Sequence, residues 1–327
     1  MPLDTGHHMT SIQRLDTILR WIHGDLDSES VAPLLQDARR RLAQRRGQKP
    51  HDESLKLLRA FLPRVVEVDG GLAVASYFKL LAGNVATLGG VRSLAGCESV
   101  ACALLNQQIT AIERACQPQI QAIVAEHDLA TPALLQQVGF ERLTCVQHEW
   151  LEIDRATPFS TAESRATIQP RRVEWRTANC LAQVRVARLI ENTFEGTLDC
   201  PAINGRRDSS QVLGGFLDGQ RLRQTQSLWQ VLLLEGAVVG CLLLQAHHES
   251  LMELVYMGLI PAARGQGLGR TLVERAIHLT RQQGSQALAV AVDEQNWPAR
   301  NVYRDYGFQC QQRFEVWMLP LQKQLDA

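Results

Sequence analysis

The segment RGQGLGR, residues 264–270, limits the possible folds of this chain more than any other stretch. It follows the apolar run LVYMGLIPAA and precedes a stretch with the period of an amphipathic helix. A helix start has unpaired backbone N–H groups and the positive end of the helix dipole, so it binds phosphate where the backbone comes close. Gly265, Gly267 and Gly269 leave that approach open, and Arg264 adds planar cationic donors. This strand-to-helix turn predicts a diphosphate site.

Three phosphate-binding patterns compete for this turn. The dinucleotide pattern GxGxxG fails because, counted from Gly265, its third glycine falls on Arg270. The phosphate-loop pattern GxxxxGK[ST] has no match, since none of the chain's lysines follows such a glycine. The third pattern, R-x-x-G-x-G between a strand and a helix, fits at every position.

A second motif makes the third pattern specific. The run N-x-x-A-x-x-x-Y-x-x-x-G-F, from Asn296 to Phe308, follows the glycine turn after one predicted helix and one predicted strand. Together, LIPAARGQGLGRTLVERA and NWPARNVYRDYGF resemble the acetyl-coenzyme-A-binding core of the GNAT superfamily of N-acetyltransferases. The resemblance covers about residues 170–320. It implies an acetyltransferase that uses acetyl-coenzyme A as co-substrate and no metal.

The resemblance also implies which residues hold acetyl-coenzyme A. The glycine turn would bind the pyrophosphate, and the strand before it would splay from its neighbour and pair with the pantetheine amides. A backbone N–H there would polarise the thioester carbonyl. The cofactor-binding candidates are Met257, Gly258, Leu259, Arg264, Gly265, Gln266, Gly267, Leu268, Gly269, Arg270, Asn296 and Tyr303.

Acetyl transfer to an amine by direct attack in a ternary complex needs a base, because free amines hold their proton at neutral pH. Several GNAT enzymes carry a catalytic glutamate where this chain has Glu253, and a solvated strand charge is the alternative interpretation. A bulge in the strand would decide whether Glu253 and Leu259 share a face. Tyr303 is the candidate acid for the departing thiolate, with a core aromatic as its alternative role. The predicted catalytic residues are therefore Glu253 and Tyr303.

The order of predicted elements favours an α/β (α+β) fold. At 327 residues the chain exceeds one hydrophobic core, and strand-like and helical patterns occur in the same order in both halves. We expect two tandem GNAT-type domains, each with a mixed, mostly antiparallel sheet flanked by helices. The expected parts are a degenerate domain with N-terminal helices at 1–153, a linker at 154–169 and a catalytic domain at 170–327.

The halves align without a gap when Gly139-Phe140 is placed on Gly307-Phe308, an offset of 168 in the numbering (308 − 140). This alignment predicts that the first half lost the site by substitution. It sets Gly96, Ser99, Ala101 and Leu135 in place of Arg264, Gly267, Gly269 and Tyr303. The form resembles tandem GNAT proteins with one degenerate half, such as mycothiol synthases.

Composition argues against nucleic-acid and membrane partners, because 34 Lys and Arg balance 34 Asp and Glu. The segment RRRLAQRR alone favours nucleic acid, and a solvated helix face explains it as well. Eight cysteines form no CxxC pair, and no secretory leader is evident, so we expect a cytoplasmic protein. The segment HEWLE has Glu152 where a zinc-binding HExxH needs histidine.

The acceptor and the oligomeric state stay open at this stage. We expect a small-molecule or peptide amine as acceptor, and a monomer or homodimer. The loop GTLDCPAINGRRDSS could select the acceptor through Glu195, Asp199 and Arg206 or Arg207, or be an ordinary solvated loop. The rival hypothesis for the whole chain is a non-catalytic acyl-coenzyme-A sensor or interaction module.

Overall fold

The computed structural model describes residues 61–68, 71–81, 85–116, 119–153, 172–181, 183–203, 228–248 and 250–319. Contacts divide the chain into two compact units, one within Met1–Arg142 and Val316–Ala327, the other within Leu143–Glu315. The N-terminal helices expected in the first domain find no counterpart in the described residues before Phe61, and Arg206 and Arg207 also lie outside the described residues. The expected domain boundaries remain a prediction, since compactness does not establish that a segment folds alone.

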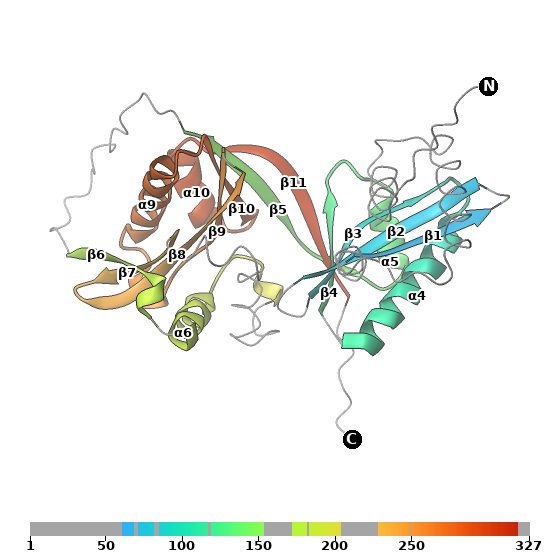
Figure 1. The fold of residues 1–327 in the computed structure, drawn as a ribbon, viewed down its shortest axis with the longest axis horizontal. Coiled ribbons are helices and arrows are strands. Elements are labelled where there is room, and N and C mark those ends of the chain that lie inside the picture. The colour runs from blue at the N-terminus through green and yellow to red at the C-terminus, as the bar shows by residue number, and fades with distance from the viewer. Residues whose placement is uncertain are drawn as a thin grey trace, which may run out of the picture. The chain divides into compact units, whose positions relative to one another are not determined.

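The first unit contains a sheet covered by two helices (Figure 1). Its elements are β1 Phe61–Val68, β2 Gly71–Leu81, β3 Val85–Ser93, α4 Glu98–Cys116, β4 Gln119–Ala125 and α5 Thr131–Gln137. β1, β2 and β3 pair antiparallel, and β3 pairs parallel with β4. Apolar side chains of the sheet and both helices form one core, in which Phe78 and Leu135 are fully buried.

The second unit has a larger sheet with helices on both faces (Figure 1). Its strands are β5 Glu141–Glu152, β6 Val173–Thr177, β7 Trp229–Leu234, β8 Ala237–His248, β9 Leu251–Leu259, β10 Ala287–Asp293 and β11 Gln309–Met318. Its helices are α6 Gln183–Phe194, α9 Leu268–Gln282 and α10 Trp297–Asp305, with short 3₁₀ turns η1 Ala178–Cys180, η2 Pro201–Ile203 and η4 Pro261–Ala263. The strand order is β11, β5, β10, β9, β8, β7 and β6. β9 and β10 pair in parallel, whereas the pairs β5–β10, β8–β9, β7–β8 and β6–β7 are antiparallel.

Strand alternation gives the second unit two cores. Leu242 and Leu244 of β8 face α9 and α10, whereas Cys241 and Leu243 face α6. α9 buries one apolar stripe against the first of these cores, at the three-to-four-residue spacing of an amphipathic helix. The predicted α/β class with mixed, mostly antiparallel sheets flanked by helices is confirmed. No helix among the described ranges is long and apolar enough to cross a membrane.

The last strand of the first half pairs within the second unit, and the end of the last strand of the second half belongs to the first unit. β5 follows α5 in the sequence, yet it pairs antiparallel with β10 from Ala287↔Glu152 onward. β11 follows α10, and just beyond its end the Leu319 N–H donates to the Ile120 carbonyl of β4 at 3.0 Å. The sequence pattern predicts these strands but not the sheet that each one joins.

The two units repeat one plan, as the sequence predicts, but not at one offset. The bulges that follow Val66 in β1 and Leu232 in β7 are related by an offset of 166 (232 − 66). The carbonyls of Leu135 and Tyr303, related by an offset of 168 (303 − 135), each accept the N–H of the phenylalanine five positions later, at 2.9 and 3.1 Å. The gap-free alignment is therefore wrong, and its error lies between the three-stranded meander and the last helix.

Candidate active site

The strands β9 and β10 separate where the resemblance implied a splay. They pair in parallel only from Leu251↔Ala287 to Leu254↔Val290. Beyond this point β9 carries a bulge at Val255, and both strands continue without pairing to each other. Their unpaired ends leave an opening in the sheet next to the start of α9.

The glycine turn presents bare backbone at this opening. Gly265 and Gly267 have φ values of +71° and +81°, which disfavour any residue with a side chain. A Cβ added to Gly265, Gly267 or Gly269 would meet no atom within 4 Å. The N–H groups of these glycines and of Leu268 donate to no acceptor among the described residues. Four open donors at a helix N-terminus form an anion-binding arrangement.

The corresponding turn of the first unit is four residues shorter. In both units the chain makes the same tight turn, because Cys97 and Ala263 each donate an N–H to the carbonyl three residues earlier, at 3.0 and 2.9 Å. In the first unit the chain is already helical after this turn, because α4 begins at Glu98 and has 19 residues, whereas α9 begins at Leu268 and has 15. The first unit thus has a helical turn where the second has the open loop, and Gly96, Ser99 and Ala101 do not lie at the positions of Arg264, Gly267 and Gly269.

A cavity of about 560 Å³ lies between the glycine turn and the splayed strands. Met257, Gly258 and Leu259 line it from β9, and Tyr303 lines it from α10. Their predicted contacts with acetyl-coenzyme A remain a prediction. The end of α6 and the segment Gly196–Asp199 close another side. This volume is within the range of ligand pockets in proteins.

Gly258 has a packing reason to be glycine. A Cβ at this position would lie 2.7 Å from the Thr193 side chain and 2.8 Å from the Tyr256 hydroxyl. The Thr193 hydroxyl donates to the Ile190 carbonyl at 2.6 Å, so it accepts from the Tyr256 hydroxyl, also at 2.6 Å. Burial raises the pKa of Tyr256 and keeps it a neutral donor. This bond holds α6 close to β9 along the cavity wall.

Arg264 binds protein carbonyls with its guanidinium. Its Nε donates to Leu259 at 3.1 Å, Nη1 to Gly196 at 3.2 Å and Nη2 to Thr193 at 2.9 Å. The last two carbonyls belong to the end of α6 and the residues after it, where helix carbonyls lack internal partners. The guanidinium thus fastens α6 to the glycine turn, a task that the sequence did not suggest. Its predicted contact with pyrophosphate remains a prediction.

The remaining residues of the turn that were predicted to bind acetyl-coenzyme A differ in which of their groups are exposed to the cavity. Leu268 packs its side chain into the core and offers only its N–H. The Gln266 amide donates to the Ala262 carbonyl at 2.7 Å, within the turn. Arg270 lines the cavity and pairs with Asp305 of α10. Arg270 therefore lines the cavity with a guanidinium group that is paired with a carboxylate.

Tyr303 is buried, with 5% of its surface exposed, and it packs on Phe308 with ring centroids 5.2 Å apart. Its hydroxyl has no hydrogen-bond partner among the described residues. Burial, and secondarily the carboxyls of Asp199 and Glu149, raise the pKa of Tyr303. The phenol is therefore neutral at physiological pH and available to a ligand in the cavity.

Asn296 and Asp199 line the cavity together with Tyr303, and Asp293 bonds to the loop that carries Asp199. The Asn296 side chain caps α10 by accepting from the Ala299 N–H at 3.4 Å. Asp199 accepts from the Asp293 N–H at 2.9 Å, and Asp293 accepts from the Cys200 N–H at 2.9 Å. This reciprocal pair anchors the loop after α6 to the end of β10. Asp293 was not predicted from the sequence, although a polar residue that ends an apolar strand was the available signal.

Glu253 lies on a different side from the candidate acid. It pairs with Gln245 on the face that α6 covers, whereas Leu259 points to the α9 face. The bulge at Val255 produces this arrangement, which answers the question of register that the sequence left open. The cavity lining from β9 begins at Leu254, so Glu253 is one residue outside it. Its role as a base remains a prediction.

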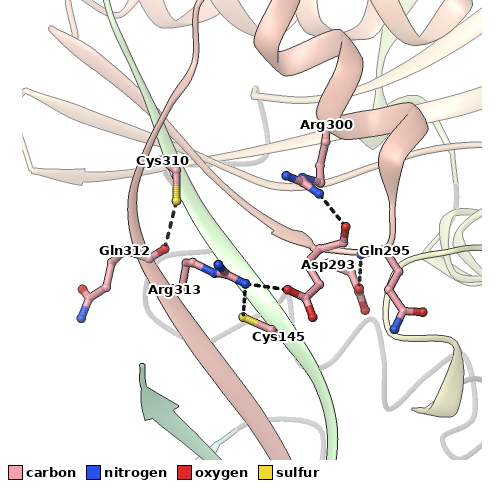
Figure 2. A network of polar contacts seen from close by, with 8 residues as sticks. Cys145, Asp293, Gln295, Arg300, Cys310, Gln312 and Arg313 are labelled. Atoms are coloured by element: carbon pink, nitrogen blue, oxygen red, sulfur yellow. Dashed lines mark hydrogen bonds and ion pairs between the residues drawn. The ribbon is translucent and has the colours of Figure 1, made fainter. Parts of the chain in front are cut away.

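No group of three or more His, Cys, Asp or Glu side chains is arranged to hold a metal ion in the described part of the chain. The polar groups behind the cavity form a network of another kind (Figure 2). Arg313 of β11 donates to Glu294 at 2.7 Å and to the Cys145 sulfur at 3.8 Å, and Arg300 donates to the Glu294 carbonyl at 2.7 Å. This network joins β5, β11 and the loop before α10.

Comparison with known proteins identifies relatives of this site. The acetyltransferase (GNAT) family profile matches residues 195–308. A mycothiol acetyltransferase from Thermomonospora curvata is 32% identical over 126 residues, which make up 36% of this chain and 42% of that protein. The match thus spans about two fifths of that relative's length.

Two solved structures have a similar fold. A GCN5-related N-acetyltransferase from Sphaerobacter thermophilus has a TM-score of 0.58 at 16% identity, covering 83% of this chain and 87% of the other. A tandem GNAT protein from the clavulanic acid biosynthesis pathway has a TM-score of 0.50 at 17% identity, covering 95% and 96%. At these identities the likeness concerns the fold alone, and it agrees with the predicted tandem form.

Proposed function

Because this chain carries an acetyltransferase domain of the GNAT family at residues 195–308, we propose that it transfers an acetyl group from acetyl-coenzyme A to a primary amine. The observation that carries the proposal is the glycine turn. Its open N–H groups, its three glycines and the adjoining cavity of about 560 Å³ suit a diphosphate joined to an extended arm.

The residues of the second unit divide the work of binding. The N–H groups of Gly265, Gly267, Leu268 and Gly269 would hold the pyrophosphate, with Arg270 beside them. The unpaired edge of β9 at Met257–Leu259 would bind the pantetheine amides. When bound, acetyl-coenzyme A supplies an activated acetyl thioester at the Tyr303 end of the cavity.

Two side chains would move protons during direct attack by the amine. Glu253 would accept the proton of the amine, directly or through a water molecule, from the α6 face of the sheet. Tyr303 would donate its hydroxyl proton to the departing thiolate, since its hydroxyl is neutral and unbonded at the cavity. Both assignments extend the family resemblance by giving Glu253 and Tyr303 specific proton-transfer roles.

The acceptor is proposed only as a class. The named activity of the Thermomonospora relative supports a small-molecule amine. A useful panel therefore contains the amine precursor of mycothiol, an aminoglycoside, a lysine peptide and a peptide with a free N-terminus. Thiol release from acetyl-coenzyme A in the presence of each amine measures the activity. A chain that binds acetyl-coenzyme A but releases thiol with no amine would favour the sensor hypothesis.

The substitution Gly269→Leu tests the proposed diphosphate binding by the glycine turn without straining the backbone. Gly269 lacks a positive φ, and an added Cβ meets open space. Leucine also suits the first turn of a helix better than glycine, by about 1 kcal/mol. We expect unchanged or higher stability and loss of acetyl-coenzyme A binding, measured by thermal unfolding and calorimetry.

The matched control is His278→Leu, which adds leucine at an exposed position on the same helix. It should bind acetyl-coenzyme A like the wild type. Normal acetyl-coenzyme A binding by a folded Gly269→Leu protein would contradict the proposal that the glycine turn binds the diphosphate.

A further inference from the structure

Two large apolar side chains line the cavity and are nevertheless exposed to solvent. Leu198 has 41% of its surface exposed, and Trp297 has 64%. Leu198 lies in the segment after α6, and Trp297 is the first residue of α10. Other apolar residues of the cavity wall, such as Leu254 and Leu272, are buried in the core. A ligand with an apolar part would remove the exposed surface of Leu198 and Trp297 from water, which is favourable.

Asp199 follows Leu198 and is the acidic residue among the described residues that line the cavity. Its carboxylate accepts from the Asp293 N–H at 2.9 Å and forms no ion pair with a described cation. The Asp293 carboxylate differs, because both of its oxygens accept backbone N–H groups, from Gln295 at 2.8 Å (Figure 2) and from Cys200 at 2.9 Å. Asp199 therefore brings a negative charge without a countercharge to the cavity, and that charge is complementary to an ammonium group.

Hydrogen bonds bring the carboxylate and the two apolar side chains together. The Asn296 N–H donates to the Asp293 carbonyl at 2.9 Å, and Asp293 in turn donates its N–H to Asp199. The Asn296 side chain also bonds to Asp199. Because its oxygen already accepts from the α10 backbone, its amide N–H₂ group is the donor in this bond. The pair Leu198–Asp199 is thus fastened to the pair Asn296–Trp297.

The backbone after Asp199 adopts an unfavourable conformation to keep this arrangement. Cys200 has a φ of +44°, in the left-handed region. For a residue with a side chain this conformation costs about 1–2 kcal/mol. The bond from the Cys200 N–H to Asp293 holds the chain there. The surrounding contacts therefore fix the position of the Asp199 carboxylate, as binding of a small ligand requires.

We propose that this cavity selects as acetyl acceptor a primary amine on a hydrocarbon skeleton, with Asp199 binding the amino group and Leu198 and Trp297 binding the skeleton. The inference rests on the proposed function and narrows its class of acceptor. Hydrogen bonds from an ammonium group to a carboxylate are charge-assisted and strong. A skeleton rich in hydroxyl groups would lose hydrogen bonds to water against the two apolar side chains, so it binds less well.

The first test compares two primary amines of similar basicity, 2-phenylethylamine and ethanolamine, on the full chain with acetyl-coenzyme A. For wild type, kcat/KM of thiol release should be higher with 2-phenylethylamine by about 10-fold or more, because its ring is buried. Trp297→Ala should lower that value by about 10-fold and leave ethanolamine and the KM for acetyl-coenzyme A unchanged. The matched control is Trp150→Ala, an exposed tryptophan of β5 that does not line the cavity.

The second test removes the charge of Asp199 and keeps its anchor. In Asp199→Asn the side-chain oxygen can still accept from the Asp293 N–H. The KM for 2-phenylethylamine should rise by about 10-fold or more, the effect expected for a hydrogen bond between charged groups. Hydroxylamine, which is largely neutral at pH 7, should be affected much less. Glu191→Gln, at an exposed position of α6, is the control and should match the wild type.

Equal kcat/KM values for the two amines in the wild type would overturn the proposal. An equal loss with both amines in Trp297→Ala would do the same, as would a raised KM for acetyl-coenzyme A, which would assign Trp297 to the co-substrate. Calorimetry separates this failure from failure of the proposed function. Binding of 2-phenylethylamine that depends on Trp297 and Asp199, without thiol release, would support the amine site and contradict acetyl transfer.

Discussion

The two units make the same tight turn after a splayed strand, but they continue differently from there. In the second unit four loop residues, 264–267, precede α9, and two of them are glycines with a positive φ. In the first unit α4 begins directly at Glu98, whose carboxylate accepts from the Gly96 N–H at 3.1 Å. The second unit therefore presents bare backbone where the first presents a helical turn with side chains.

The comparison shows which part of the fold is scaffold and which part is site. The bulged meander occurs in both units, since β2 shifts register after Tyr77 and β8 after Leu243, an offset of 166 (243 − 77). In both, the parallel pair stops after four residues of each strand. Splaying therefore belongs to the shared fold, whereas the open loop of residues 264–267 belongs to the second unit. Under the proposed function, diphosphate binding depends on this loop. Four predictions test this conclusion.

The largest effect should come from deleting residues 264–267, which gives the second unit the loop length of the first. Acetyl-coenzyme A binding and thiol release should both disappear, because the open N–H donors of Gly265 and Gly267 are lost. The first unit shows that a helix can follow this tight turn directly, so circular dichroism should still report a folded chain. Binding by the deletion variant would mean that the helix start alone is sufficient.

Replacing Tyr303 by the residue of the first unit should have the next largest effect. Leu135 occupies the equivalent position and is fully buried, so Tyr303→Leu should fit the core. We expect kcat to fall about 10²-fold or more, because the general acid is removed. Binding of acetyl-coenzyme A by calorimetry should change much less. Equal losses in binding and kcat would point to a packing role for the tyrosine.

Arg264→Gln tests the hydrogen bonds that join the glycine turn to the end of α6. The first unit has no counterpart of this arginine, and the variant loses charged donors to the Gly196 and Thr193 carbonyls. We expect a loss of about 1–3 kcal/mol in the free energy of unfolding. The KM for the amine should rise more than the Kd for acetyl-coenzyme A, since Gly196–Asp199 lines the cavity. The reverse ranking would assign the guanidinium to the pyrophosphate.

The smallest effect should follow Glu98→Gln in the first unit. The carboxylate lies in the first turn of α4 and is exposed, so its loss should cost at most about 1 kcal/mol of stability. Affinity for acetyl-coenzyme A should not change, because the open donors are in the second unit. A change in that affinity would show that the two helix starts are not independent.

Local chemistry explains what the sequence could predict. Glycines at residues 265 and 267 are required by backbone angles, and the apolar periods of α9 and β10 report their burial directly. These features depend on neighbours in the chain, so the order of elements and the glycine turn were predicted correctly. The splay was also predicted, from the family resemblance.

Features that depend on distant pairing were missed. Glu149 looks like any charge on a half-buried strand until β5 is placed beside β10. The contacts of Arg264 need the end of α6, far earlier in the chain, at 2.9–3.2 Å. The difference between the two turns was hidden because the offsets on either side of it, 166 and 168, differ by only two residues. Sequence spacing alone could not show that α4 begins a turn earlier than α9.

The placement of β5 ties the second unit to the first half of the sequence. A chain that began after β5 would leave an unprotected edge along β10. A gene encoding residues 170–327 alone would therefore specify an incomplete sheet.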